Sequence, residues 1–262
     1  MNITSIPKFV VNLERRPDRL EHIRKEMDYM GWEYELFKAV DLNNHGGCTL
    51  SHTEIIKIAK ERGYDSVMVI EDDCTFLPYS KDLINKIESE SEDFEFGIIN
   101  LAPTLNRPVN RSEKQPLFLD ITNLPPKKEY ERGIFATNMM IYHSSIYDNI
   151  LEIEQPEKLG YYAIDDYIYQ FVLPIKQSYC PILPIAPQMS SWSDVSQGQY
   201  NNFYTQTYNW NLYSPCKIPS EYLHGTLTDE MKKNKTRIIA QKPNTISTSP
   251  SICNIFSCLE YL

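Results

Sequence analysis

The sequence predicts an α/β fold with a mostly parallel central sheet and helices on its faces. Short apolar runs in the first 101 residues alternate with stretches whose apolar residues recur at helical spacing. The clearest run, Val67–Ile70, contains no polar residue, which is typical of a strand buried on both faces. Strands that alternate with helices in this way pair in parallel, because each helix returns the chain to the same edge of the sheet.

The first strand is predicted over residues 9–13, and the helix that follows it begins at Pro17. Proline suits a first helical position because its φ is fixed and its missing N–H would have no partner there. Apolar residues then fall at spacings of three and four, and Gly31 ends the stripe. A second short strand is expected at residues 35–40, followed by Asp41.

Two further helices complete the alternation. Ser51 and Glu54 have the spacing of a capping box, in which a hydroxyl and a carboxylate bond free helix N–H groups reciprocally. The helix they begin is expected to reach about Arg62, ahead of the strand that contains the clearest apolar run. Another helix is predicted over Ser80–Glu90, and a strand over Phe96–Leu101.

The second half of the chain is less regular. Residues 102–132 hold five prolines and many charges, which predicts a long loop. Residues 133–142 return to strand-like composition, and a helix capped by Ser144 or Ser145 should follow. A further helix is expected to begin at Ile164.

We expect a single domain over residues 1–213, which is long enough to form a catalytic domain, and a C-terminal extension over residues 214–262. The apolar pattern weakens after about residue 213, and residues 242–251 are polar and rich in Pro, Ser and Thr. Such a segment buries little apolar surface, so the extension is predicted to be loosely docked or partly disordered.

Composition and charge exclude several classes of partner. The formal net charge of −9 argues against nucleic acid, because phosphate backbones bind basic surfaces. There is no GxGxxG or Walker pattern, and the six scattered cysteines suggest free thiols rather than a disulfide framework. No signal peptide and no apolar run of membrane-spanning length is evident, so a cytoplasmic protein is the default expectation. The oligomeric state is not readable from the sequence.

Three acids, Glu71, Asp72 and Asp73, follow the buried strand directly. Because unpaired acids cannot enter a core, they are expected at the carboxyl end of the strand, where open α/β sheets bind ligands. In extended backbone, Glu71 and Asp73 would face one way and Asp72 the other. Two converging carboxylates suit a hard cation such as Mg²⁺ or Mn²⁺. A solvated acidic turn, or an acid that caps a nearby helix, explains the stretch equally well.

Two further charged groups stand at the ends of predicted elements. Arg15, Arg16 and Arg19 follow the first strand and could form a local anion site, because guanidinium groups match phosphate oxygens. Surface arginines paired with neighbouring acids are the alternative. Asp165 and Asp166 stand where a helix begins, a favourable place for acids. Arginines beside a metal-type acid pair together indicate a metal-bridged diphosphate.

Three motifs follow one another in the first 73 residues: VNLERRPDR at 11–19, GCTLSH at 47–52 and VIEDD at 69–73. In this order and spacing they resemble the successive motifs of glycosyltransferase family 25, which includes lipooligosaccharide and procollagen galactosyltransferases. IDDYI at 164–168 and residues 133–151 are similar to later segments of that family. The resemblance covers roughly residues 8–200.

The resemblance implies a GT-A (Rossmann-like) fold and an inverting, metal-dependent glycosyltransferase. The enzyme would transfer a hexose, galactose or glucose, from a UDP-sugar to an acceptor hydroxyl. Glu71–Asp73 would act as the DxD motif, with Asp73 and Glu71 holding Mn²⁺ (or Mg²⁺) between the two phosphates. The implied contacts of the nucleotide sugar are Asn12, Arg15, Arg16, Arg19, Asp41, His52, Glu71 and Asp72.

Several of the implied roles have alternatives. Asp165 best matches the family's catalytic base, with Asp166 close behind, although both suit the cap of a helix. His52 is either a substrate contact or a residue that orients its loop. Asp194 is either a third metal ligand or part of a surface turn.

Two other functions stay open at this point. A metal-dependent phosphohydrolase would use the same acid triplet with water as the acceptor. A non-catalytic nucleotide-sugar or glycan-binding protein would keep the fold without turnover. The acceptor itself, a glycan or a hydroxylysine-type protein, is not encoded in any short motif.

Overall fold

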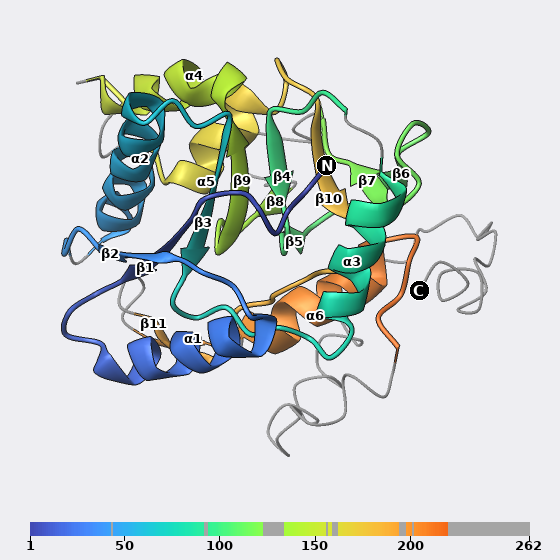
Figure 1. The fold of residues 1–262 in the computed structure, drawn as a ribbon, viewed down its shortest axis with the longest axis horizontal. Coiled ribbons are helices and arrows are strands. Elements are labelled where there is room, and N and C mark those ends of the chain that lie inside the picture. Colours follow the sequence, from blue (N-terminus) through green and yellow to red (C-terminus); the bar gives the residue numbers. More distant parts are fainter. Residues whose placement is uncertain are drawn as a thin grey trace, which may run out of the picture.

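Helices cover both faces of an eight-stranded sheet in the computed structural model of the protein (Figure 1). The strand order is β2-β1-β3-β9-β4-β10-β7-β6, and β9 and β7 run antiparallel to both of their neighbours. This mixed, mostly parallel sheet confirms the predicted fold class. The structure describes residues 1–42, 44–91, 94–122, 134–155, 157–158, 162–193, 198–200 and 202–219.

The strands are short, and those in the middle of the sheet are buried on both faces. The main sheet consists of β1 (Lys8–Asn12), β2 (Glu35–Lys38), β3 (Ser66–Glu71), β4 (Ile98–Asn100), β6 (Asn110–Arg111), β7 (Phe118–Asp120), β9 (Met139–His143) and β10 (Ser178–Pro181). Two further pairs are formed by β5 (Thr104–Leu105) with β8 (Ile134–Phe135), and by β11 (Ser191–Ser193) with β12 (Gly198–Tyr200).

The helices form two groups, one on each side of the sheet. Figure 1 shows α2, α4 and α5 together on one side and α1, α3 and α6 on the other. Their bounds are α1 (Pro17–Met30), α2 (His45–Glu61), α3 (Ser80–Glu90), α4 (Tyr147–Leu151), α5 (Ile164–Tyr167) and α6 (Asn202–Tyr213). Short 3₁₀ turns at Ser144–Ile146 and Glu152–Glu154 flank α4, and a π-helical turn at Ile168–Val172 continues α5.

The first hundred residues follow the predicted alternation of strands and helices. β1 pairs in parallel with both β2 and β3, and Val11 lies opposite Glu71. Gly31 ends α1 with a left-handed φ of 71°, a conformation that glycine adopts without steric cost. The apolar residues of β3 are fully buried, as the unbroken run predicts.

The predicted start of the second helix was wrong. α2 begins at His45, and the side chain of Asn44 caps it by accepting a hydrogen bond from the Gly46 N–H at 2.8 Å. Ser51 lies inside the helix, where its hydroxyl donates to the Gly47 carbonyl at 2.7 Å and accepts from the Val40 N–H at 2.9 Å. The helix therefore reaches six residues further toward the N-terminus, and its first turn packs against the chain that leaves β2.

Two features of the second half also differ from the prediction. The segment expected to be one long loop contains β5, β6 and β7, and β7 extends the main sheet by pairing with β10. Its last part, residues 123–133, lies outside the described residues. The cap before α4 is the His143 side chain, which accepts from the Ser145 N–H at 3.1 Å, and neither of the two serines takes that role.

The C-terminal part contains a helix that was not predicted. α6 is Asn- and aromatic-rich, and its hydrophobic side chains Phe203 and Trp210 are buried. After it, Cys216 and Ile218 are also buried, so residues 214–219 pack onto the domain. The rest of the predicted C-terminal extension, residues 220–262, lies outside the described residues.

The sequence also predicts free cysteine thiols and no segment of membrane-spanning length. The cysteines of the described part of the chain, Cys48, Cys74, Cys180 and Cys216, are free thiols. No helix among the described residues is both long and apolar enough to cross a bilayer.

Candidate active site

A cavity of about 540 Å³ opens at the carboxyl ends of β1 and β3. β9 runs antiparallel to β3 with Met139 opposite Ile70, so the residues that precede β9 reach the same edge of the sheet. The N-terminal turns of α2 and α5 complete the wall. This is the edge at which α/β sheets bind ligands, and the three acids lie at its centre.

Glu71 is the last residue of β3 and the point where three other side chains converge. The Thr137 hydroxyl donates to Glu71 Oε1 at 3.1 Å, and the Cys48 thiol lies 3.7 Å from the same oxygen. His52 Nε2 lies 3.4 Å from it. Although burial alone raises the pKa of Glu71, the neighbouring His52 and Thr137 bring that pKa below its ordinary value. Glu71 is therefore held as a carboxylate.

Asp72 is fixed by two polar partners and is almost fully buried. Asn12 Nδ2 donates to Asp72 Oδ2 at 2.7 Å, and Arg19 Nη1 donates to Asp72 Oδ1 at 3.0 Å. Burial raises the pKa of Asp72, and the Arg19 guanidinium opposes that rise. Asn12 and Arg19 thus hold the acid segment in place from the N-terminal part of the chain.

Asp73 is the acid of the triplet with the least complete set of partners. Its Oδ2 lies 3.4 Å from Arg19 Nη1 and 3.5 Å from Gln188 Nε2. Its Oδ1 is buried and has no hydrogen-bond partner among the described residues. Burial, followed by the negative charge of Glu71, raises the pKa of Asp73 to about 7. A buried oxygen without a donor is an energetic cost that a bound cation would remove.

These residues fit the divalent cation that the family resemblance implies. Asp73 presents a carboxylate oxygen to which no described residue donates, and Glu71 lies two residues away on the wall of the same cavity. Hard cations such as Mn²⁺ and Mg²⁺ take carboxylate oxygens as ligands. Asp194, the expected third ligand, lies outside the described residues.

The expected alternation of the three acids was wrong, because β3 ends at Glu71 and the chain turns at once. Arg19 Nη1 contacts both Asp72 and Asp73, so these two carboxylates share the Arg19 guanidinium instead of facing opposite ways. Strand periodicity applies only while the backbone stays extended.

Of the two remaining arginines, Arg15 is 39% exposed, whereas Arg16 is about as buried as Arg19. Arg15 lines the cavity and forms a bidentate pair with the exposed Asp41, its Nε lying 3.0 Å from Oδ2. Arg16 pairs with Asp18 at 2.8 Å, at the start of α1. Of the residues predicted to contact the nucleotide sugar, Arg15, Arg19, His52, Glu71 and Asp72 line the cavity, whereas Asn12, Arg16 and Asp41 are not among its lining residues.

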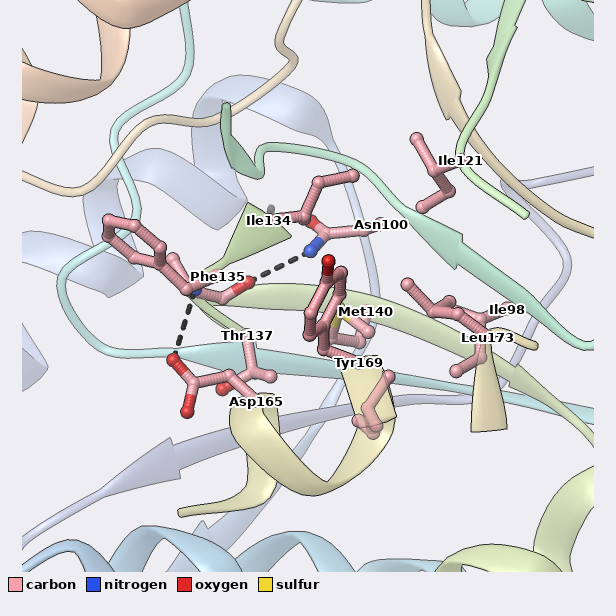
Figure 2. Close-up of a pocket in the computed structure, with 12 residues that line it drawn as sticks. Ile98, Asn100, Ile121, Ile134, Phe135, Thr137, Met140, Asp165, Tyr169 and Leu173 are labelled. Carbon is pink, nitrogen blue, oxygen red and sulfur yellow. Dashed lines mark hydrogen bonds between the residues drawn. The ribbon is translucent and has the colours of Figure 1, made fainter. Parts of the chain in front are cut away.

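Asp165 and Asp166 both line the cavity from the first turn of α5. Figure 2 shows the Asp165 carboxylate beside the segment that joins β8 to β9, where the Ala136 N–H donates to Asp165 Oδ2 at 3.4 Å. Asn100 Nδ2 holds the carbonyl of the same alanine at 2.8 Å. Ala136 has a left-handed φ of 72°, a costly conformation for alanine, and these two contacts stabilise it.

His52 does not stand at the start of a helix, as the sequence prediction assumed. It lies in the middle of α2 with no exposed surface, and its Nδ1 lies 2.9 Å from the Tyr142 hydroxyl on β9. Its position follows from the earlier start of α2, which places His52 opposite Glu71 rather than at the surface.

Four residues of the site were not foreseen: Cys48, Thr137 and Gln188 line the cavity, and Tyr142 contacts His52 behind it. Cys48 was detectable, because it stands four residues before His52, and residues at this spacing share one face of a helix. Thr137, Tyr142 and Gln188 come from segments that meet the site only through β9 and through the bridge between Cys74 and Gln188. No local motif marks them.

Comparisons with known proteins agree with the motif-based resemblance. The model of glycosyltransferase family 25, described as an LPS biosynthesis protein, matches residues 43–147. A comparison with curated protein sequences finds no match.

Two solved structures are similar to this chain at low sequence identity. One is a glycosyltransferase involved in the glycosylation of the major capsid of PBCV-1 (TM-score 0.40, 13% identity, 67% of this chain and 80% of that chain covered). The other is mannose-1-phosphate geranyltransferase from Thermus thermophilus (TM-score 0.38, 10% identity, 68% of this chain and 74% of that chain covered). At these TM-scores the likeness adds no argument to the family match.

Proposed function

Residues 43–147 match the model of glycosyltransferase family 25, and from this match we propose that the chain transfers a hexose from a UDP-sugar to an acceptor hydroxyl. The sugar would be galactose or glucose, and the acceptor a glycan or a hydroxylysine-type protein. The transfer would depend on Mn²⁺ or Mg²⁺ and would invert the anomeric centre.

One observation carries this proposal: a buried Asp73 oxygen that has no hydrogen-bond partner in the described part of the chain lines, together with Arg15 and Arg19, one cavity large enough for a nucleotide sugar. The cavity of about 540 Å³ is lined by Arg15, Arg19, Glu71 and Asp73, and also by Asp165. Clefts of about 300–1,000 Å³ are the usual size for ligands of this class. Cationic and metal-binding groups in the cavity suit a diphosphate, and the Asp165 carboxylate in the same cavity suits an acceptor hydroxyl.

The donor would bind with its diphosphate against Asp73 and Glu71, which would hold the cation. A bound Mn²⁺ or Mg²⁺ supplies charge neutralisation for the departing nucleoside diphosphate. Arg15 lies at the rim, where its guanidinium can exchange the exposed Asp41 carboxylate for a phosphate oxygen. Arg19 is already committed to Asp72 and Asp73, so its role is to position the acids.

Asp165 is the proposed general base. Its carboxylate would accept the proton of the acceptor hydroxyl as that oxygen attacks the anomeric carbon, in a single displacement. The Ala136 and Asp166 N–H groups each donate to one of its oxygens, which orients the carboxylate on the cavity wall. Asp166 lines the same wall and is the second candidate for the base.

The first test is a thermal-shift and hydrolysis screen of UDP-, GDP- and CMP-sugars with and without Mn²⁺. Metal-dependent stabilisation by one UDP-sugar, with slow release of UDP, is expected. No shift with any nucleotide would overturn the proposed donor site. Release of phosphate or free sugar at a rate that acceptors do not change would indicate a phosphohydrolase, and nucleotide binding without any turnover would indicate a binding protein.

Site variants then assign the roles. Asp73→Ala should lose transfer and metal-dependent nucleotide binding while the protein stays folded, and Asp18→Ala, which changes an exposed acid, serves as the matched control. Asp165→Asn should lower kcat by about 10²–10⁴-fold with little change in donor binding. Transfer at the wild-type rate in Asp165→Asn, with loss in Asp166→Asn, would move the base to Asp166.

A further inference from the structure

We propose that Cys48, His52 and Glu71 form a second metal site, specific for a borderline transition metal of the zinc class. Their ligand atoms, Sγ, an imidazole nitrogen and a carboxylate oxygen, all lie within 4.8 Å of one another. The sulfur and nitrogen ligands of this second site distinguish it from the proposed Asp73 cation site, and its presence does not require that the protein be a transferase. It shares only Glu71 with that site.

Two of the three distances between ligand atoms match those of a tetrahedral zinc centre. Zinc binds sulfur at about 2.3 Å and nitrogen or oxygen at about 2.0–2.2 Å, which places neighbouring ligand atoms about 3.3–3.7 Å apart. Cys48 Sγ and Glu71 Oε1 are 3.7 Å apart, and His52 Nε2 and Glu71 Oε1 are 3.4 Å apart. Two of the three ligand pairs therefore already have the required separation without any metal.

His52 provides the strongest individual observation. It is fully buried, and its Nε2 has no hydrogen-bond partner among the described residues although it points to the Glu71 carboxylate. Its other nitrogen, Nδ1, lies 2.9 Å from the Tyr142 hydroxyl. In the tautomer in which Nδ1–H donates to Tyr142, Nε2 presents its lone pair to the cluster. A metal-ligating histidine is typically held in this way through its second nitrogen.

The surroundings of the other two ligands also suit a metal. Thr137 donates to Glu71 Oε1 at 3.1 Å and so fixes the carboxylate from outside the cluster. One thiolate and one carboxylate together balance the charge of a divalent ion, which matters in a site with little solvent. Cys48 and Glu71 line the cavity, so the ion has a path from solvent and a fourth position open to water.

The donor set decides which metal binds. Mg²⁺ and Mn²⁺ prefer oxygen ligands, whereas a thiolate and an imidazole favour Zn²⁺ and its spectroscopic substitute Co²⁺. Three protein ligands with a fourth position open is the arrangement of catalytic rather than structural zinc sites. In this protein all three ligands line the cavity proposed to bind the donor, so the fourth ligand would come from that cavity.

The test is optical titration of the full-length, chelator-treated protein with Co²⁺ under anaerobic conditions. We expect a near-ultraviolet cobalt–thiolate charge-transfer band that saturates at one equivalent and is erased by Zn²⁺ but not by Mg²⁺. Cys48→Ser should abolish the band, whereas Cys180→Ser, which changes a buried thiol on β10, should retain it. Far-UV circular dichroism and thermal unfolding establish that each variant is folded.

A variant outside the three ligands adds a graded readout. Tyr142→Phe removes the hydroxyl next to His52 Nδ1 and should weaken Co²⁺ binding by about 10–100-fold without removing the band. Absence of the band in folded wild-type protein, or a band that survives Cys48→Ser, would overturn the proposal.

The outcome is separable from that of the proposed function. Asp73→Asn should lose transfer but keep the cobalt–thiolate band, because Asp73 is not one of the three ligands. A band in a protein without transferase turnover would support this site and reject the proposed function. Turnover in a protein without the band would do the reverse.

Discussion

The cost of removing Arg19 can be estimated from the two carboxylates that it serves. Its side chain is 12% exposed, and it donates to Asp72, which is 8% exposed, and contacts Asp73, which is 7% exposed. Arg19→Met keeps much of the apolar stem but leaves two buried acids without their cation. Removing one partner of a buried ion pair destabilises a protein by about 3–5 kcal/mol. We expect a loss in this range at neutral pH.

The matched control is Arg15→Met, because Arg15 pairs with Asp41 where both side chains are substantially exposed, at 39% and 50%. Ion pairs of that kind contribute about 0–1 kcal/mol. The double variant Arg19→Met/Asp72→Asn should regain part of the loss, since it removes the charge of Asp72 that Arg19→Met leaves without its cation. The ordering of the three variants therefore reports on burial rather than on the number of charges changed.

Urea unfolding followed by circular dichroism, without divalent cations, measures these free energies. The reasoning requires Arg19→Met to cost several times more than Arg15→Met. Equal losses in the two single variants would refute it, as would a double variant less stable than Arg19→Met, because either result would mean that the buried acids are not the source of the cost.

Three further predictions concern pH, zinc and packing. Burial raises the pKa of Asp73 from 3.8 to about 7, so the folded state binds this proton more tightly. The contribution of Asp73 to wild-type stability therefore falls as pH rises from about 4 to about 7. Asp73→Asn lacks this dependence. In urea unfolding without divalent cations, its free energy of unfolding should exceed that of wild type by almost nothing at about pH 4 and by about 2–4 kcal/mol above about pH 7. A difference that stays constant with pH contradicts this. Zinc should inhibit a Mn²⁺-dependent transfer because it competes for Glu71. Cys48→Ser should lose that inhibition when its rate is compared with its own rate without zinc. Equal inhibition of both proteins argues against a shared Glu71. Gly47→Ala should cost about 1–3 kcal/mol in urea unfolding, because its Cβ would lie 2.5 Å from the Val40 carbonyl oxygen, and a neutral effect would show that this contact relaxes freely.

The sequence was sufficient for those parts of the fold that depend on local patterns. The alternation of strands and helices up to β4 follows from short apolar runs, helical spacing and a glycine at the end of α1. The start of α2 did not follow, because Gly46 and Gly47 have low helix propensity and only the Asn44 cap and the packing of the first turn offset it. β6 and β7 were missed because strands of two or three residues carry almost no periodic signal.

The candidate site was foreseeable only where its residues are consecutive or share a motif. The acid triplet and the arginines after β1 stand out in the sequence, and the structure brings Arg19 to the acids. The partners of His52 and Glu71 did not stand out, since Tyr142 and Thr137 lie far along the chain and reach the site through strand pairing. Local sequence cannot encode a contact that depends on where a distant strand inserts.

The place of β9 has a consequence for how the protein is made. β9 lies between β3 and β4, so the nascent chain completes β3, α3 and β4 before the strand that joins them leaves the ribosome. Until residues 139–143 emerge, the apolar β3 keeps one unpaired edge, and β4 lacks its partner on that side. Non-local pairings of this kind form slowly and leave strand edges open to association with other chains. Translation speed through residues 101–143 therefore sets how long this edge of β3 stays unpaired.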